Sequence, residues 1–366
     1  MMVPYTNLPM QGSVEWPELS AILARVILKG NFILGEEVQA FEREFADFCG
    51  VKHAIGVGNG TDSLILCLRL LGIGRGDEVI TAPNSWISSA SAVALVGAKP
   101  VFADVGPDQL IDPEEVADKI TKKTKAIIPV HLTGRMADMF SLTRLSEETG
   151  IPLIEDAAQA VGAKRGLFAP GLGGNLCSYS LHPLKNLNAC GDAGIITTNN
   201  DDFASELRLL RNHGLKDRDH VVQWGFNSRL DELQAAILRY RLKYLRPTIE
   251  RRRQLARIYN DGLEYQAHVT TPEPEREQEY HTYHVYVIQC EKRDQLKEYL
   301  AAKGIETKIH YPIPIHMQEV PINDQPGDFP VTEDQSQRIL SLPINQYLSD
   351  MQVRYVVENI KAFYER

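Results

Sequence analysis

The sequence predicts an α/β fold, with a large domain built on a mostly parallel sheet and a smaller α+β domain after it. The length of 366 residues exceeds one average domain and suits this two-part organisation. Between residues 50 and 200, short β-rich runs alternate with helical stretches, which is the rhythm of βαβ units. After residue 227 this rhythm changes to one long helical pattern and then to mixed strands and helices.

Seven short β-rich runs are the expected strands of the large sheet. In chain order they are Ala54–Val57, Glu78–Ala82, Pro100–Val105, Ala126–Val130, Leu153–Glu155, Leu176–Ser180 and Gly194–Thr197. Helical patterns such as Asp62–Leu71 and Ser88–Val96 lie between them, so the strands should pair mostly in parallel with helices on both faces. Ligands of such sheets bind at the carboxyl ends of the strands, where we look for the site.

The second half of the chain predicts the smaller domain. A helical pattern runs from Arg229 to about Leu263, and Pro247 should break or kink it. The later segments are expected as a strand, a helix, a second strand and a loop, over Tyr283–Cys290, Asp294–Lys303, Thr307–Tyr311 and Ile313–Val331. We place the large domain at residues 1–245 and the small one at 246–366, and the N-terminal segment is free to pack on the small domain.

The composition disfavours several classes of protein. A net charge of −9 gives no global attraction to nucleic acid or to an anionic membrane. No apolar run approaches the ~20 residues of a transmembrane helix, and the first residues lack the features of a signal peptide. The five cysteines are scattered and form no CxxC pair, which argues against a disulfide framework and a structural zinc site. We expect a cytoplasmic protein with no metal, nucleic-acid or membrane partner.

Two groups of titratable residues have simple interpretations. The run Arg251–Arg253 lies in a helical pattern and is typical of a solvated helix face; the alternative, a nucleic-acid patch, is disfavoured by the net charge. His281 and His284 are three residues apart at the start of an expected strand. Their side chains should therefore point to opposite faces and not share a metal ion.

Asp156 and Lys185 form the most informative pair in the chain. Asp156 ends an expected strand, and Lys185 follows the next one, twenty-nine residues later. This pairing suits pyridoxal phosphate (PLP), because a lysine amine forms a Schiff base with the aldehyde and an acid keeps the pyridine nitrogen protonated. Burial would lower the pKa of the lysine, which could then act as nucleophile and general base. The alternatives are a helix N-cap for Asp156 and a solvated surface position for Lys185.

A glycine-containing turn after the first strand is the candidate phosphate site. The segment Val57–Ser63 leads from a strand into a helix, whose N-terminus offers free N–H groups and a positive dipole end. Gly60 lets the backbone approach a ligand closely, and Thr61 and Ser180 can each add a hydroxyl. An ordinary βα turn is the alternative interpretation.

Two more residues could contact a bound ring. Trp86 follows the second strand and could stack on the ring, or it could fill the gap between helix and sheet. Gln159 comes one helical turn after Asp156 and could reach the ring hydroxyl, or it could be a solvated helix residue.

Together these segments resemble the DegT/DnrJ family of PLP-dependent sugar aminotransferases. The matching segments are Asn59–Asp62, Glu155–Gln159, Ser180–Lys185, Gly225–Ala236, His310–Pro314 and Leu342–Pro343, and the resemblance spans about residues 35–348. It implies the aspartate aminotransferase fold, fold type I. Where many members carry a second glycine, Ala193 follows Gly191 and Asp192, a small change that does not affect the lysine.

The resemblance implies a role for each candidate. Lys185 would form the Schiff base, Asp156 would pair with the ring nitrogen, and Trp86 would stack on the ring. Thr61 and Ser180 would hold the phosphate. Asn227 would reach the phosphate held by the neighbouring subunit, because family sites form at a homodimer interface.

The resemblance also implies a reaction. Glutamate would convert PLP to pyridoxamine phosphate, and a keto sugar, usually linked to a nucleotide diphosphate, would then take the amino group in a ping-pong cycle. We add a hypothesis of our own for the donor carboxylate, which Arg229 could bind from the neighbouring subunit; the alternative is an ion pair of Arg229 with Asp231 or Glu232. His310 and Tyr311 are candidates to line the sugar site.

Three other functions remain as alternatives. A PLP-dependent sugar dehydratase is one, although relatives of that type replace the lysine with histidine and this chain has Lys185. A non-catalytic regulator on the same fold is the second, and the presence of lysine, acid and phosphate turn disfavours it. A nicotinamide dehydrogenase is the third, and the lack of GxGxxG after a strand counts against it.

Overall fold

The structure is a computed structural model that describes residues 1–320 and 328–365. Its large sheet contains the seven predicted strands: β1 (His53–Val57), β2 (Glu78–Thr81), β3 (Lys99–Phe102), β4 (Thr124–Ile128), β5 (Ile154–Asp156), β7 (Leu176–Ser180) and β8 (Gly194–Thr198). Their order is β1-β8-β7-β5 and β4-β2-β3, and parallel pairs such as Ile127 with Leu153 join β4 to β5. Only β8 runs antiparallel to its neighbours in this sheet, so the predicted mostly parallel sheet is confirmed.

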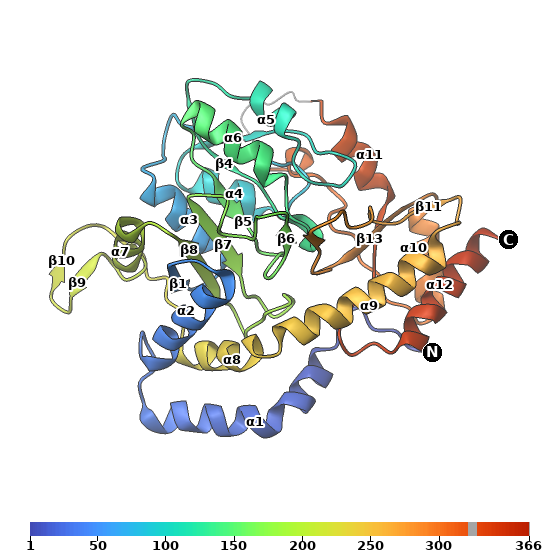
Figure 1. Ribbon diagram of the computed structural model, residues 1–366, viewed down its shortest axis with the longest axis horizontal. Coiled ribbons are helices and arrows are strands. Elements are labelled where there is room, and N and C mark those ends of the chain that lie inside the picture. Colours follow the sequence, from blue (N-terminus) through green and yellow to red (C-terminus); the bar gives the residue numbers. More distant parts are fainter. Residues whose placement is uncertain (321–327, 366) are drawn as a thin grey trace.

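Helices cover both faces of this sheet (Figure 1). One face packs on α3 (Gly60–Leu70), α4 (Ser88–Leu95) and α7 (Asp201–Leu210). The other packs on α2 (Glu36–Cys49), α5 (Pro113–Asp118), α6 (Met139–Thr149) and α8 (Glu232–Leu242). Neighbouring residues of one strand enter opposite layers, as Ile127 and Ile128 of β4 do, which explains why these strands are continuous apolar runs.

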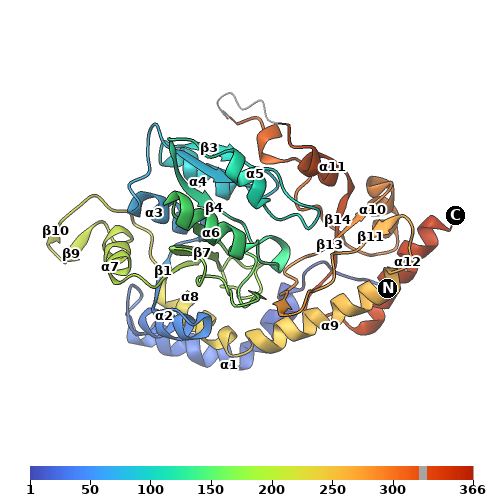
Figure 2. The same ribbon diagram turned by 45° about the horizontal axis from the view of Figure 1, so that its top comes forward.

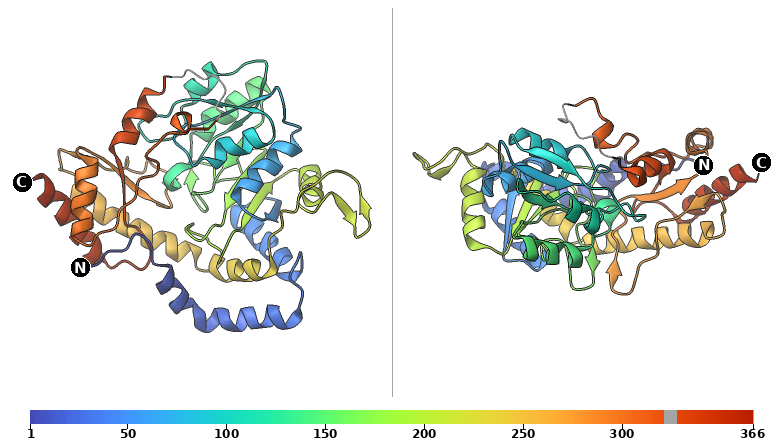
Figure 3. Two further views of the ribbon diagram at one scale, coloured as in Figure 1. Left: turned by 180° about the vertical axis from the view of Figure 1, so that it is seen from behind. Right: turned by 90° about the horizontal axis from the view of Figure 1, so that it is seen from above.

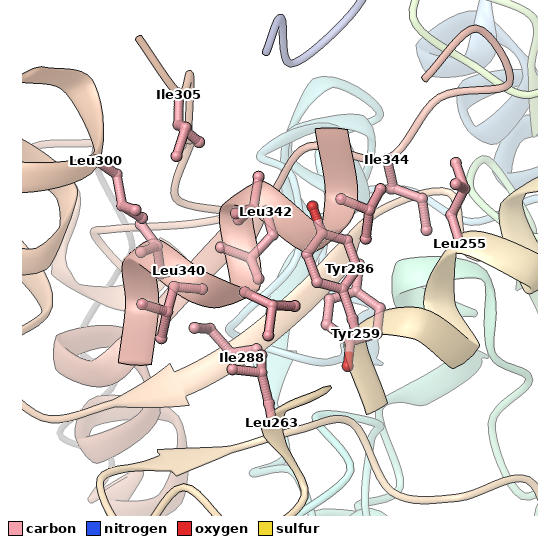
Figure 4. Close-up of a cluster of buried hydrophobic side chains, with 14 of the residues drawn as sticks. Leu255, Tyr259, Leu263, Tyr286, Ile288, Leu300, Ile305, Leu340, Leu342 and Ile344 are labelled. Atoms are coloured by element: carbon pink, nitrogen blue, oxygen red, sulfur yellow. The ribbon is translucent and has the colours of Figure 1, made fainter. Parts of the chain in front are cut away.

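The smaller sheet is antiparallel and has the order β11-β13-β14, formed by Val269–Thr270, Tyr286–Cys290 and Ile339–Leu342. It packs against α9 (Leu245–Leu263), α10 (Arg293–Ala302) and α12 (Asp350–Tyr364) around a separate apolar core. Figure 4 shows this core, in which the rings of Tyr259 and Tyr286 stack with centroids 4.7 Å apart. Figure 2 shows the small sheet at the opposite end of the molecule from β9 and β10.

The N-terminal segment belongs to both parts. Val3 is fully buried in the small core and pairs with Ile305. Helix α1 (Leu8–Lys29) then lies along α8, as the rear view in Figure 3 also shows. Leu19 of α1 packs there against Ile237 and Tyr240. None of the helices in the described part of the chain is long and apolar enough to cross a membrane.

The remaining elements are short. They are the strand pairs β6 (Lys164–Arg165) with β12 (Glu279–Tyr280) and β9 (Leu215–Asp217) with β10 (His220–Val221), helix α11 (Pro330–Arg338), and the 3-10 turns η1 (Leu132–Gly134) and η2 (Ile315–Met317). The predicted break near Pro247 is confirmed, because α8 ends at Leu242 and α9 begins at Leu245. Pro247 itself lies in the first turn of α9, where its missing N–H group costs nothing.

Two predictions for the C-terminal part are wrong. In place of a strand over Thr307–Tyr311, only Lys308 pairs, with Ser341 of β14. Pro312 and Pro314 follow without N–H donors, so the pairing cannot continue. The segment expected as the loop Ile313–Val331 contains η2 and the start of α11, and residues 321–327 of it lie outside the described residues.

Candidate active site

Four segments bring the predicted residues to one edge of the large sheet. Asp156 is the last residue of β5, and Lys185 lies five residues beyond the end of β7. Trp86 follows β2, and the η1 turn follows β4. These strands run parallel, so the segments after them meet at their carboxyl ends, where ligands of such sheets bind.

Asp156 is a buried carboxylate whose two oxygens both have donors. Its Oδ2 accepts a hydrogen bond from Ser89 Oγ at 2.9 Å, and its Oδ1 accepts one from the Ala158 amide at 3.1 Å. The helix N-cap interpretation is wrong, because residues 157–163 form turns and no helix starts there. The Ala157 amide donates to Ser178 O instead, which keeps the chain along β7 after β5 has ended.

Lys185 is half-buried, and its amine has no hydrogen bond or ion pair within the described part of the chain. Burial lowers the pKa of this lysine to about 8, and the negative charge of Asp156 opposes the shift. A substantial fraction of the amine is therefore neutral at pH 7 to 8, which a solvated surface lysine would not be. The surface interpretation of Lys185 is wrong.

The turn before α3 packs tightly against the segment that carries Lys185. Asn59 caps α3 by accepting a hydrogen bond from the Asp62 amide at 2.8 Å. A Cβ atom on Gly60 would lie only 2.7 Å from Ser180 Cβ, so a larger residue does not fit. Thr61 Oγ1 lies 2.8 Å from Ser88 Oγ. The structure thus brings Gly60, Thr61 and Ser180 together at a helix N-terminus.

Trp86, Gln159 and Tyr311 form a connected wall. Trp86 is 55% exposed and leans on Tyr311 with ring centroids 5.5 Å apart, so it does not fill a gap between helix and sheet. Gln159 is buried, not a solvated helix residue. Its Oε1 accepts from the Thr133 amide at 2.8 Å, and its Nε2 donates to the Tyr311 hydroxyl at 3.3 Å. Thr133 has a φ of +61°, which lets this turn present its amide to Gln159.

His310 stands beside this wall, on the small-sheet side. Its Nδ1 lies 2.8 Å from Ser341 Oγ, and its ring stacks on Tyr5 at 5.9 Å. Burial, together with the positive charges of Lys185 and Lys308, lowers the pKa of His310 to about 4. Burial also raises the pKa of Tyr311. Both side chains are therefore neutral near pH 7 and can act as hydrogen-bonding groups without adding charge.

Asn227 and Arg229 flank Ser228, whose Oγ accepts from the Gly58 amide at 3.0 Å and donates to Asp62 Oδ2 at 2.6 Å beside the candidate phosphate turn. Asn227 is exposed, and the Arg229 Nη1 donates to Asn212 Oδ1 at 3.0 Å. The predicted alternative, an ion pair of Arg229 with Asp231 or Glu232, is wrong. Glu232 instead accepts from the backbone amides of residues 37 and 38, at 3.0 and 2.9 Å, at the start of α2.

The arginine run on α9 is also not a solvated face. Arg252 is 7% exposed and donates only to backbone carbonyl oxygens. Arg253 pairs with Glu275 and lies over the Tyr280 ring. The prediction failed because three arginines in a row occupy three different sides of a helix, and only Arg251 faces outward, toward Asp350.

The described residues fit a phosphorylated pyridine aldehyde such as PLP. Asp156 offers a buried carboxylate for a protonated ring nitrogen, and Lys185 offers an unpaired amine for the aldehyde. Trp86 presents an exposed aromatic face. The N-terminus of α3, with Thr61 and Ser180 beside it, offers N–H and hydroxyl donors for a phosphate.

Comparison with known proteins places the chain among aminotransferases. The family model of the DegT/DnrJ/EryC1/StrS aminotransferase family matches residues 17–361. The chain belongs to this family. It is 42% identical, over its full length, to the pleiotropic regulatory protein of Geobacillus stearothermophilus, of which it covers 99%. It is 39% identical, also over its full length, to the dTDP-3-amino-3,4,6-trideoxy-alpha-D-glucose transaminase of Streptomyces venezuelae, of which it covers 97%.

A solved structure supports the same assignment. The crystal structure of S. venezuelae DesV in complex with a ketimine intermediate matches with a TM-score of 0.97 at 38% identity, covering 100% of this chain and 99% of that one. The family resemblance and the fold class predicted from the sequence are therefore confirmed.

Sequence reasoning missed several residues of the site. Ser89 holds Asp156, Ser88 meets Thr61, and the Thr133 amide fixes Gln159. The only sequence signal for the two serines is their position directly after Trp86, at the start of α4. No signal marked Thr133, because it acts through its backbone.

Proposed function

We propose that this chain is a PLP-dependent aminotransferase that moves an amino group from glutamate to a keto sugar linked to a nucleotide diphosphate. The observation that carries the proposal is the unpaired Lys185 amine, with a pKa of about 8, near the buried Asp156 carboxylate. The transaminase name of the Streptomyces relative and the ketimine in DesV support the reaction class.

Each residue would have a separate task. When bound, PLP draws electrons from the substrate carbon and carries the amino group between the two substrates. Lys185 Nζ would bond the aldehyde and, once released, accept and return the proton at the substrate carbon. Asp156, held by Ser89, would keep a proton on the ring nitrogen. Gln159, fixed by the Thr133 amide, would direct its Nε2 toward the ring hydroxyl and Tyr311.

The phosphate would lie at the N-terminus of α3. Gly60 keeps that end of the helix free of a side chain, and Thr61 and Ser180 would donate hydroxyl hydrogen bonds. Trp86 would cover one face of the ring. His310 and Tyr311, both neutral, would line the sugar site without repelling a diphosphate group.

We also propose a homodimer with shared sites, in which Asn227 reaches the phosphate held by the neighbouring subunit. The side chains around Asn227 support this, because Val222, Trp224 and Phe226 are apolar and exposed in a single chain. Mixing Lys185→Ala with Asn227→Ala tests it. Hybrid dimers would contain one intact site, so activity should return to about a quarter of the wild-type value. No recovery, with hybrids shown by mass spectrometry, would contradict shared sites.

Two further expectations remain proposals. We place the protein in the cytoplasm, and all five of its cysteines are free, as a reducing compartment allows. We keep the domain division between residues 245 and 246, which falls at the start of α9.

A non-catalytic regulator is the second candidate, favoured by the name of the Geobacillus relative. The two readings differ in one measurement, the visible absorbance of the purified protein with PLP before and after L-glutamate is added. An aminotransferase should lose the long-wavelength band on addition of glutamate, and Lys185→Ala should neither form nor lose it. A band that persists with glutamate would favour the regulator or a dehydratase, and no band would exclude PLP.

A further inference from the structure

Arg252 is a buried cation without a counter-charge. It lies on α9, is 7% exposed, and forms no ion pair within the described chain. Its Nη1 donates to three carbonyl oxygens, those of Tyr283 at 3.1 Å, His284 at 3.2 Å and Ile344 at 2.9 Å. Burial lowers the pKa of Arg252 only to about 10, so the guanidinium keeps its charge near pH 7.

The other edge of the same guanidinium is unused. Nε is buried and has no hydrogen-bond partner, and Nη2, which is not enclosed, has no acceptor among the described residues. Nε and Nη2 form one side of the planar fork that binds the two oxygens of a carboxylate. A buried charge with an unsatisfied Nε donor is costly, and an anion at this edge would remove much of that cost.

Arg252 lines a small cavity together with Lys185. The cavity has a volume of about 30 Å³, and Gln11, Asn188 and Gln346 also line it. None of the twelve described residues around it carries a carboxylate, although the chain as a whole has a net charge of −9. The N-terminus of α1, capped by Asn7, supplies further positive potential at the cavity wall.

The size and the charge of the cavity define its ligand. Two water-sized groups fill about 30 Å³, which matches the two oxygens of a carboxylate. Because Lys185 lines the same cavity, the bound molecule would have its carboxylate beside the amine that starts the proposed reaction. Glutamate carries both a carboxylate and an amino group.

We propose that Arg252 binds a carboxylate of the amino donor through its Nε–Nη2 edge, a step that rests on the proposed aminotransferase function. Arg229, predicted for this task from the neighbouring subunit, is hydrogen-bonded to Asn212 within its own chain and does not line this cavity. Arg252 would therefore set the preference for a carboxylate-bearing donor. It is a binding residue, separate from those that hold the ring and the phosphate.

The first test uses glutarate, which has both carboxylates of glutamate but no amine. Its affinity for the PLP-loaded protein can be measured by calorimetry. Arg252→Gln should weaken glutarate roughly tenfold to a hundredfold, as expected for loss of hydrogen bonds to a charged group. Arg252→Lys should fall between Gln and wild type. Arg251→Gln is the matched control, because it removes the same charge from the next residue, which pairs with Asp350 and faces away from the cavity. It should leave glutarate binding unchanged.

Arg252 also holds three backbone carbonyl groups, so its replacement could disturb the fold. A second variant, Gln346→Glu, leaves Arg252 and its bonds in place and adds a carboxylate at the half-buried cavity wall. It should weaken glutarate to a similar extent without a drop in melting temperature. Full glutarate affinity in Gln346→Glu, or in a folded Arg252→Gln, would overturn the inference.

Two further measurements separate this inference from the proposed function. The affinity for dTDP should be the same in wild type and Arg252→Gln, and a selective loss of dTDP would show that the cavity serves the nucleotide instead. If wild type binds glutarate through Arg252 but its absorbance does not respond to glutamate, the transaminase proposal fails and the carboxylate site stands. If glutamate reacts equally well in wild type and Arg252→Gln, the carboxylate site fails and the transaminase proposal stands.

Discussion

Asp156 and Arg252 are both buried charges near Lys185, but the protein treats them differently. Asp156 has a donor for each oxygen, from Ser89 and from the Ala158 amide, so its position is set before any ligand arrives. Arg252 has three acceptors on one nitrogen and none among the described residues on the other two. Asp156, which would hold the cofactor ring, has its hydrogen bonds satisfied within the chain. Arg252, which faces the small cavity, keeps donors that a ligand could satisfy.

The largest effect is expected from Asp156→Asn, which removes the charge whose hydrogen bonds are already satisfied within the chain. The amide keeps the shape and most of the hydrogen bonds, but it cannot hold a proton on the ring nitrogen. We expect the rate of the glutamate half-reaction to fall roughly 10²–10³-fold, measured by stopped-flow absorbance. Ser89→Ala is the control: it removes one donor but keeps the charge, and it should cost about tenfold or less. Equal rates in Asp156→Asn and wild type would remove Asp156 from the mechanism.

The pH dependence of PLP capture should show how burial and the charge of Asp156 set the pKa of the Lys185 amine. Only the neutral amine can bond the aldehyde, so the capture rate of the cofactor-free protein should rise about tenfold per pH unit below the pKa of about 8 and level off above it. The charge of Asp156 raises this pKa, so in Asp156→Asn the plateau should begin at a lower pH. If the rate continued to rise up to about pH 10.4, the ordinary pKa of a lysine side chain, the buried state of Lys185 would be contradicted.

Gly60→Ala tests the close contact at the phosphate end. The added Cβ would lie 2.7 Å from Ser180 Cβ, and we expect a loss of about 1–3 kcal/mol in the free energy of unfolding, measured with urea and without PLP. The double variant with Ser180→Gly should recover most of this loss, because it removes the atom that clashes. Gly12→Ala, with nothing within 4 Å of the new methyl group, should not destabilise the protein.

Trp86→Ala should produce the smallest of these effects. Its ring is half exposed, so loss of stacking should weaken PLP about threefold to tenfold in a fluorescence titration. Tyr311→Phe keeps the ring on which Trp86 leans and removes only a long hydrogen bond from Gln159, so it should change the affinity less than about threefold. A larger effect from Tyr311→Phe than from Trp86→Ala would show that the hydroxyl, not the stack, supports the cofactor.

Much of the large sheet could be predicted because its strands are buried on both faces and read as apolar runs. Ile127 and Ile128 enter different cores, so the pattern carries a clear signal. The pairing of Asp156 with Lys185 was also visible, because two unlike residues follow two neighbouring strands. In contrast, the Thr307–Tyr311 strand was predicted from local composition, and pairing depends on partners that local composition does not show.

The residues that sequence reasoning missed act through geometry. Thr133 contributes a backbone amide from a residue with left-handed backbone angles. The residue type does not predict this conformation. Arg252 looked like one charge in a solvated run, and its burial depends on which side of α9 meets the small sheet. The side-chain chemistry of a site can be read from sequence more easily than the packing that makes one arginine different from its neighbours.

The path of the N-terminal segment limits how the two parts of the molecule can move. Val3 is anchored in the small core, and α1 is packed along α8 of the large layer, so the chain crosses between the two parts at residues 5–8 as well as at α9. Other contacts also join the two parts, because β6 pairs with β12 and Thr332 of α11 donates to Asp104 of the large part. One attachment carries Asn7 and the other carries Arg252, and both line the cavity beside Lys185. Any relative movement of the two parts would therefore change the shape of this cavity.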